Sequence, residues 1–111
     1  MFKRQKARRL LSVSESILKR RLVDVNDRIK RLRAELAVTE EQLAFLEDEA
    51  EDARLRGLVS ETPLGEAEAR ESRKHADAMA KQRDVLARSI AALLREQDDL
   101  LDRMAAELTT R

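Results

Sequence analysis

The sequence of 111 residues contains no cysteine, tryptophan or tyrosine, and only two phenylalanines, two glycines and one proline. Without cysteine, these residues support neither disulfides nor thiolate chemistry. The scarcity of aromatic residues argues against a β-sheet, which usually needs β-branched and aromatic side chains. So few helix breakers, with 41% charged residues, are typical of long helices or a coiled coil. Disorder is the rival interpretation at this charge density.

Long apolar runs are missing as well. The longest covers residues 90–94, far too few to span a bilayer. The start Met1-Phe2-Lys3-Arg4 is basic, but no apolar core follows it, so it does not resemble a secretory signal. We therefore expect a cytoplasmic protein.

Groups of chemically reactive residues are also scarce. His75 is the single histidine, which excludes a histidine metal cluster or a conventional catalytic triad within one chain. No GK[ST] motif follows Gly57 or Gly65, so there is no phosphate-binding loop. The many carboxylates are spread along solvated helix faces. We predict no enzyme, and no metal, cofactor or small-molecule substrate.

Two apolar stripes dominate what is present. Within each, the steps alternate between four and three residues, which is the heptad spacing of a left-handed coiled-coil seam. Strands would show a period of two, and a disordered chain would show none. The first stripe comprises Leu18, Leu22, Val25, Ile29, Leu32, Leu36, Thr39, Leu43, Leu46, Ala50 and Ala53. The second comprises Ala69, Ser72, Ala76, Met79, Arg83, Leu86, Ile90, Leu93, Gln97, Leu100 and Met104.

A single cluster of helix breakers, at residues 57–65, separates the stripes. Gly57 suits the left-handed residue just past a helix end, and Thr62 followed by Pro63 suits an N-cap and a first helical residue. The sequence therefore predicts one domain over residues 1–111. Its parts are a basic arm at 1–9, a helix at 8–56, a turn at 57–62 and a helix at 63–108.

A turn this short makes the two helices antiparallel neighbours, so that the numbers of facing residues add up to a constant. A sum of 122 sets Leu22 against Leu100 and small residues against small ones near the turn. Val25 against Gln97 is the one poor layer. A shift by one heptad, to 129, sets leucines against charged residues. The register of 122 also brings Arg54 near Glu66, Glu47 near Arg73, Arg28 near Glu96 and His75 near Glu49.

Each helix carries more apolar residues than one seam needs. Because two helices form a thin core of marginal stability, and an exposed apolar stripe indicates a partner surface, we expect the all-α hairpin to bind another helix. The partner is a second copy, giving a four-helix bundle, or another helical protein. Scattered surface leucines are the alternative. The predicted helix-partner interface comprises Val38, Phe45, Leu94, Leu101 and Leu108.

Charge is distributed unevenly along the chain. Residues 1–33 carry a net charge of +9, and residues 34–55 carry −7. Several interpretations of this basic segment remain open. It binds nucleic-acid phosphates, or it lies on an anionic membrane. Otherwise it docks on an acidic protein surface or stays solvated. The candidate binding residues are Lys3, Arg4, Lys6, Arg8, Arg9, Lys19, Arg20 and Arg21.

The hairpin tip, outlined by acids, comprises Gly57, Ser60, Glu61, Thr62 and Pro63. A slender hairpin with carboxylates at its end resembles the N-terminal coiled coil of Gre-type transcript-cleavage factors. The resemblance implies insertion into the secondary channel of RNA polymerase, where tip acids help to hold a metal ion. Glu61 matches one of these acids, whereas Leu58 stands where the other is expected, and the family's globular C-terminal domain has no counterpart in these 111 residues.

The function predicted from these features is that of a non-enzymatic coiled-coil adaptor, scaffold or assembly factor that acts through protein–protein interaction. One alternative is a regulator associated with nucleic acid or RNA polymerase, using the basic arm or the acidic tip. A further alternative is a peripheral membrane-surface binder that uses the basic N-terminal segment.

Overall fold

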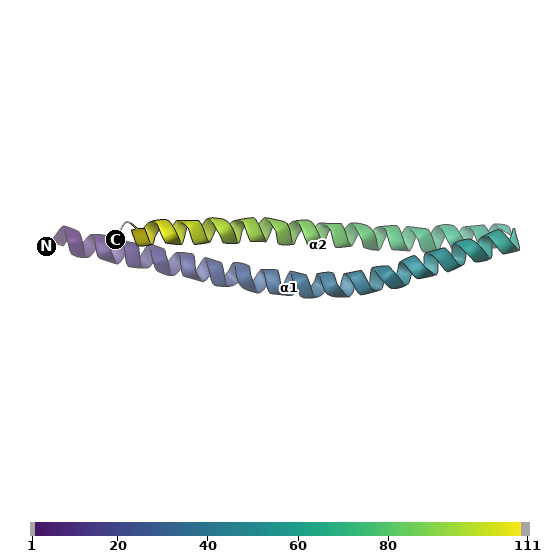
Figure 1. Cartoon of the computed structure of the whole chain (residues 1–111), viewed down its shortest axis with the longest axis horizontal. Helices are drawn as coiled ribbons and strands as arrows, with labels where there is room; N and C mark the ends of the chain where they lie inside the picture. Colours follow the sequence, from purple (N-terminus) through teal and green to yellow (C-terminus); the bar gives the residue numbers. More distant parts are fainter. Residues whose placement is uncertain (1, 110–111) are drawn as a thin grey trace. The chain divides into compact units, whose positions relative to one another are not determined.

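The computed structural model describes residues 2–109, with the side chains of residues 3–10 and 12–109. It contains two α-helices, α1 (Phe2–Ser60) and α2 (Pro63–Thr109), which pack against each other and run in opposite directions (Figure 1). The described part contains no β-strand. The prediction of an all-α antiparallel helical hairpin is therefore confirmed.

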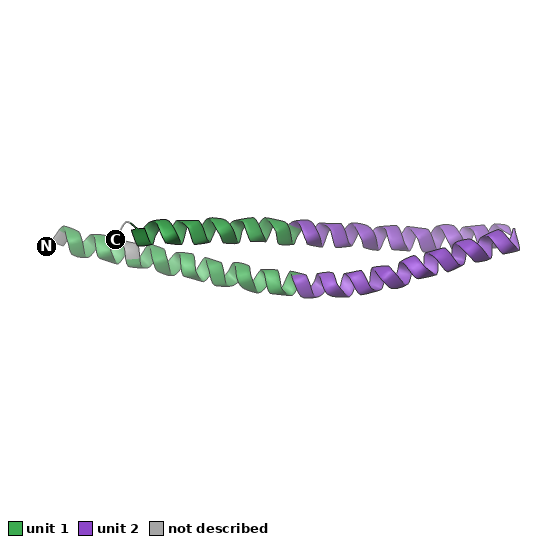
Figure 2. Cartoon of the chain, viewed as in Figure 1, with its two compact units in different colours: residues 1–32, 89–111 green, residues 33–88 purple. Residues whose placement is uncertain are grey.

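The contacts divide the chain into two compact units (Figure 2). Unit 1 comprises Met1–Leu32 and Ser89–Arg111, and unit 2 comprises Arg33–Arg88. Each unit therefore contains a stretch of α1 packed on a stretch of α2, and unit 2 includes the turn.

The core of unit 1 is built from large aliphatic side chains. Leu18, Val25 and Ile29 of α1 are buried against Leu93 and Leu100 of α2. Burying each of these side chains contributes about 1.5–3 kcal/mol before conformational entropy is subtracted. Apolar burial is thus the main source of stability in this unit. The half-buried residues around this core are Leu22, Leu32, Leu94 and Met104.

The core of unit 2 is smaller in volume. Its buried side chains are those of Leu43, Ala50, Ala53 and Ala76, together with the polar Thr39. Alanine side chains let two helix backbones approach closely, but each contributes less apolar area than leucine. Unit 2 therefore gains less from apolar burial per turn than unit 1 does.

The predicted seam is confirmed residue by residue. Every residue of both stripes is buried or half-buried, including the polar Ser72, Arg83 and Gln97. Most residues outside the stripes are exposed. The four-three spacing thus identified the faces that the two helices turn toward each other.

The turn is shorter than predicted, because α1 continues through Gly57 to Ser60. Gly57 is helical, and the left-handed residue is Glu61, with a φ of 51°. The Glu61 N–H donates to the Gly57 carbonyl over 3.1 Å, which closes the last turn of α1. The prediction that Gly57 ends the helix was wrong.

Gly57 serves close helix packing instead. A Cβ added there would lie 3.1 Å from the backbone carbonyl oxygen of Gly65, on the facing helix. A Cβ on Gly65 would in turn lie 3.4 Å from the Gly57 Cα. The two glycines thus face each other, and their numbers add up to the predicted 122. A side chain at either position would therefore crowd the backbone of the facing helix.

The start of α2 agrees with the prediction. Helix α2 begins at Pro63, and the Thr62 hydroxyl accepts a hydrogen bond of 3.1 Å from the Gly65 N–H. This is the bond that an N-cap residue makes to the third helical residue. Pro63 has no N–H to leave unpaired at the first helical position.

The start of α1 lies earlier than the expected residue 8. The helix begins at Phe2, so most of the predicted arm at 1–9 is helical, and Met1 lies outside the described residues. This stretch contains neither glycine nor proline and consists mostly of arginine and lysine, with one glutamine and one alanine. These residues have high helix propensity, which accounts for the difference.

Candidate functional site

Polar side-chain contacts between α1 and α2 fix the register of the hairpin. They join Gln97 to Asn26 over 2.6 Å and Ser14 to Glu107 in unit 1, and Arg73 to Glu47 over 2.7 Å in unit 2. The position numbers of these pairs add up to 123, 121 and 120. These sums match the predicted register of 122 and not the register one heptad away.

The Glu47–Arg73 ion pair, predicted from the register, is confirmed. The hydrogen bond from Arg73 lowers the pKa of Glu47 below its ordinary value, and Arg73 also binds Asp77 over 3.0 Å. Arg54, which was expected near Glu66, forms its ion pair within α1 instead. Arg54 donates two hydrogen bonds to Glu51, three residues earlier, and thereby lowers the pKa of that carboxyl.

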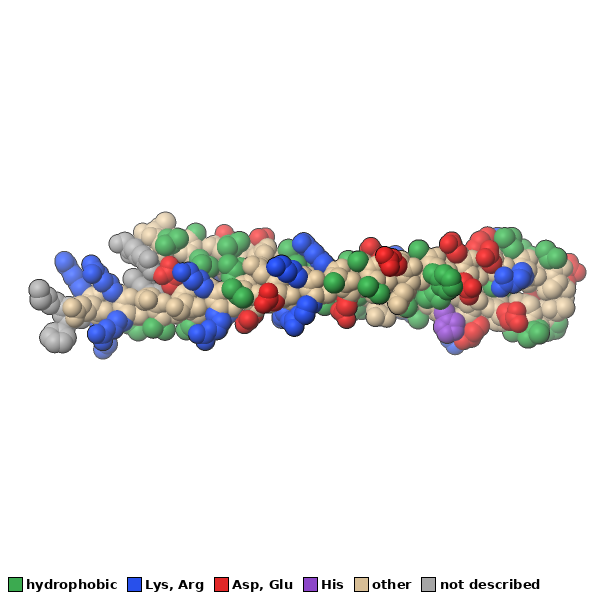
Figure 3. Space-filling model, turned by 90° about the horizontal axis from the view of Figure 1, so that it is seen from below, with side chains coloured by type: hydrophobic (Ala, Val, Ile, Leu, Met, Phe, Trp, Pro, Cys, Tyr) green, Lys and Arg blue, Asp and Glu red, His purple; other side chains and the backbone are tan. Residues whose placement is uncertain are grey.

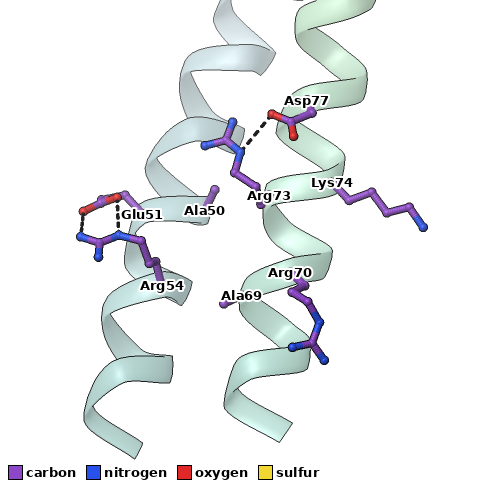
Figure 4. Close-up of a pocket in the computed structure, with 8 residues that line it drawn as sticks. All are labelled: Ala50, Glu51, Arg54, Ala69, Arg70, Arg73, Lys74 and Asp77. Carbon is purple, nitrogen blue, oxygen red and sulfur yellow. Dashed lines mark hydrogen bonds and ion pairs between the residues drawn. The ribbon is translucent and has the colours of Figure 1, made fainter. Parts of the chain in front are cut away.

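A shallow groove crosses the small-residue part of the seam in unit 2 (Figure 4). Ala50 and Ala69 form its floor, one from each helix. Its cations Arg54 and Arg73 are already engaged by carboxylates, and Lys74 points away from the space between the helices. Arg70 is the one further cation among the lining residues, and a single exposed arginine does not form a converging set of charges that would select an anionic ligand.

The predicted helix-partner residues fall into two groups. Val38 and Phe45 are exposed on α1 in unit 2, where 64% of Phe45 is accessible. Leu101 and Leu108 are exposed on α2 in unit 1, and Leu94 is half-buried against the unit 1 core. The two groups lie in different units, so each is considered as a separate apolar line.

The predicted basic residues are all exposed and all lie on α1 in unit 1. Figure 3 shows Lys and Arg side chains gathered along this part of the helix. A shallow hollow is lined by Lys3, Gln5, Lys6 and Arg9. The eight exposed residues are Lys3, Arg4, Lys6, Arg8, Arg9, Lys19, Arg20 and Arg21.

The tip carries a feature that the sequence interpretation missed. Ser60, Glu61, Thr62 and Pro63 are exposed there and Gly57 is buried, but aliphatic side chains stand out as well as acids. Figure 3 shows hydrophobic side chains at the surface around the turn. The spacing of Leu55, Leu58 and Val59, which puts them on one outward helix face, was the available signal. The exposed aliphatic residues are Leu55, Leu58, Val59 and Leu64, of which Val59 is 87% accessible.

The residues that the structure describes offer little for metal or proton chemistry. Among residues 2–109, no three or more His, Cys, Asp or Glu side chains are grouped so that they could hold a metal ion. The metal site implied by the resemblance to transcript-cleavage factors therefore has no such group at the tip. His75 is exposed and lies 3.4 Å from Glu71 of the same helix, in place of the expected Glu49.

Neither helix, over its described length, has a segment long and apolar enough to cross a membrane. Comparison of the chain with protein-family models, with curated proteins and with solved structures found no match.

Proposed function

We propose that this chain is a non-enzymatic coiled-coil adaptor, a scaffold or assembly factor that acts through protein–protein interaction. The observation that carries the proposal is the line of Leu94, Leu101 and Leu108 on α2 in unit 1. Their spacing of seven places them on one helix face, beside the seam but outside it. Leu101 and Leu108 remain exposed in the single chain.

Neighbouring residues on the same face complete a second heptad pattern with these leucines. Ala91, Asp98 and Ala105 are exposed, and with the leucines they repeat the four-three spacing of the seam. Alanine lets a partner helix approach closely, and leucines at this spacing fit between its side chains. Asp98 is the one charged member, so a partner helix that fits the line offers a lysine or arginine opposite it.

The test compares two doubly substituted chains. Leu101→Glu/Leu108→Glu places charges on the line, whereas the control Val23→Glu/Val85→Glu places the same charges at isolated exposed valines. Each tagged chain is expressed in the cells from which the protein comes. It is purified after cross-linking, and the proteins bound to it are identified and quantified. We expect the control to retain the partners of the original chain and the leucine variant to lose them. Equal partner sets in all three chains would contradict the proposal.

A second candidate function is binding to a nucleic acid. Lys3, Arg4, Lys6, Arg8 and Arg9 are exposed on successive turns of α1. At 3.6 residues per turn they point in all directions around the helix and leave no broad apolar face for a membrane. A phosphate polymer can contact several of them at once, and each neutralised phosphate adds salt-dependent affinity.

This candidate is tested with a duplex DNA at several salt concentrations. We expect binding that weakens steeply with salt and is lost when Lys3, Arg4, Lys6, Arg8 and Arg9 are all replaced by glutamine. Substituting the same number of basic residues on α2 is the control. Absence of binding at low salt would eliminate this function, and binding only to phosphatidylserine vesicles would assign the segment to a membrane.

A further inference from the structure

A second apolar line runs along α1, on the side away from the seam. Leu10 and Ile17 in unit 1, and Val38 and Phe45 in unit 2, are separated by multiples of seven residues. They therefore occupy the same heptad position, outside the seam. All four are exposed, with Leu10 65% and Phe45 64% accessible. No described residue of the chain covers these four side chains.

The residues that continue the line are charged, and their order gives the pattern a symmetry. Asp24 and Arg31 lie between the two apolar pairs, while Lys3 precedes them and Asp52 follows, all of them exposed. When a second copy of the line is placed antiparallel to the first, every basic residue faces an acidic one and every apolar residue faces an apolar one. A surface that is complementary to itself in this way suits an isologous contact between identical chains.

We propose that a second copy of this chain docks antiparallel along this line of α1. The twofold axis passes between Asp27 and Arg28 of the two copies. The pairs across the interface are Lys3 with Asp52, Leu10 with Phe45, Ile17 with Val38, and Asp24 with Arg31.

Neighbouring charges select the antiparallel direction. The α1 segment up to residue 33 carries +9, and the segment 34–55 carries −7. Antiparallel docking sets each basic segment against the acidic segment of the other copy, and parallel docking would set like charges together. Flanking positions agree, since Lys6 comes opposite Glu49, Arg20 opposite Glu35 and Asp27 opposite Arg28.

The register is selected as well. Shifting one copy by a heptad in one direction sets Arg31 against Arg31 of the second copy and Leu10 against Asp52. Shifting it in the other direction sets Asp24 against Asp24 and Ile17 against Arg31. Both alternatives combine a like-charge contact at the twofold axis with apolar residues against charges.

The surface beside Phe45 is shaped for an apolar side chain. A hollow next to it is lined by Glu41, Gln42, Leu46 and Met79. All of these residues belong to unit 2. In the proposed register the exposed Leu10 of the second copy lies over this hollow, and it would cover apolar surface that is open in the single chain.

The inference rests on the proposed function only in that the chain acts through protein contacts, and it uses α1 instead of α2. The test is sedimentation equilibrium of the full chain, with circular dichroism as the check on helicity. We expect a dimer that Leu101→Glu/Leu108→Glu retains. In Ile17→Glu/Phe45→Glu, four charges enter the apolar part of one interface, so the dissociation constant should rise at least ~100-fold.

A charge exchange tests the pairing without touching apolar residues. Asp24→Arg sets like charges together twice per dimer, and should weaken association about tenfold. Adding Arg31→Asp restores opposite charges and should restore the original affinity, which misfolding would not do.

A third readout is the relative orientation of the two copies. Because the chain has no cysteine, a Leu10→Cys chain mixed with a Phe45→Cys chain should cross-link, whereas Leu10→Cys alone should not.

Several outcomes would overturn the inference. These are a monomer at tens of micromolar, a dimer that Ile17→Glu/Phe45→Glu leaves intact, no rescue by the charge exchange, or self-cross-linking of Leu10→Cys. A monomer whose partners still depend on Leu101 and Leu108 would leave the proposed function standing. A dimer that Asp24→Arg weakens and Arg31→Asp restores, in a chain whose partners do not depend on Leu101 and Leu108, would support the inference and contradict the proposed function.

Discussion

The adjacent leucines 100 and 101 provide a matched test of the seam. Leu100 is 2% accessible and belongs to the unit 1 core, whereas Leu101 is 47% accessible on the outward face of α2. Replacing a buried leucine by alanine costs about 2–5 kcal/mol. A seam between only two helices can relax around the gap, so we expect about 2–3 kcal/mol for Leu100→Ala.

The expected cost of Leu101→Ala is much smaller. About half of the Leu101 side chain is already in water, so at most ~1 kcal/mol of burial is lost, and leucine and alanine have similar helix propensities. Urea unfolding followed by circular dichroism, at a concentration low enough to avoid association, measures both variants. With a slope of about 1–2 kcal/mol per molar urea, Leu100→Ala should lower the midpoint by roughly 1–3 M. Equal shifts for both variants would refute the assignment of the seam.

Three further changes test the turn and the inter-helix ion pair. Thr62→Ala removes the cap of α2 and should cost about 1 kcal/mol in urea unfolding, with Thr62→Ser close to the original; an unchanged midpoint for the alanine variant would contradict the cap. Gly57→Leu forces a side chain against the Gly65 backbone and should cost about 1–3 kcal/mol, whereas a gain from helix propensity would show that the helices can separate there. The folded-state pKa of Glu47 lies below its ordinary value of 4.5, so its ionised form stabilises the fold above that pH and the contribution fades as the pH falls through the folded pKa. Glu47→Gln should therefore be slightly less stable than the original chain near neutral pH and equal to it in acid, and a difference independent of pH would exclude the ion pair with Arg73.

The hairpin and its register could be predicted from the sequence because the relevant signals are periodic and redundant. More than twenty seam residues repeat the same spacing, so single exceptions such as Thr39 did not obscure it. The break between the stripes contained a recognisable cap at Thr62 and Pro63. Only one register matched apolar residues with each other along both stripes, and the Glu47–Arg73 contact followed from it.

The remaining features depend on contacts that periodicity does not report. Gly57 is compatible with a helix end and with close helix packing, and only the facing Gly65 decides between them. Gln97 looked like a poor partner for Val25, but its amide instead donates to Asn26, a residue outside the stripe. The pairing of Arg54 depended on whether Glu51 or Glu66 lay closer, which residue spacing alone does not settle.

The sequence identified the individual apolar residues of these lines, but it did not show which of them are exposed in the folded chain. Leu101 and Phe45 were grouped into one predicted interface, and the structure places them in separate units. The exposed tip aliphatics Leu58 and Val59 were overlooked because the surrounding acids dominated the composition of that segment. Exposure in the folded chain supplied the information that the sequence lacked.

Spin labels at Glu47 and Arg73 measure directly whether α2 folds back on α1 in the register of 122. These positions are 26 residues apart in sequence, and cysteine substitution labels only them because the chain has no cysteine. Diluting labelled chains into unlabelled ones removes signals between copies. We expect direct proximity for this pair, and a separation about 10 Å greater along the helix axis when the second label is moved seven residues, to Ala80. A shorter distance for the Ala80 pair, or about 39 Å for the Arg73 pair as in one unbroken helix, would contradict this register.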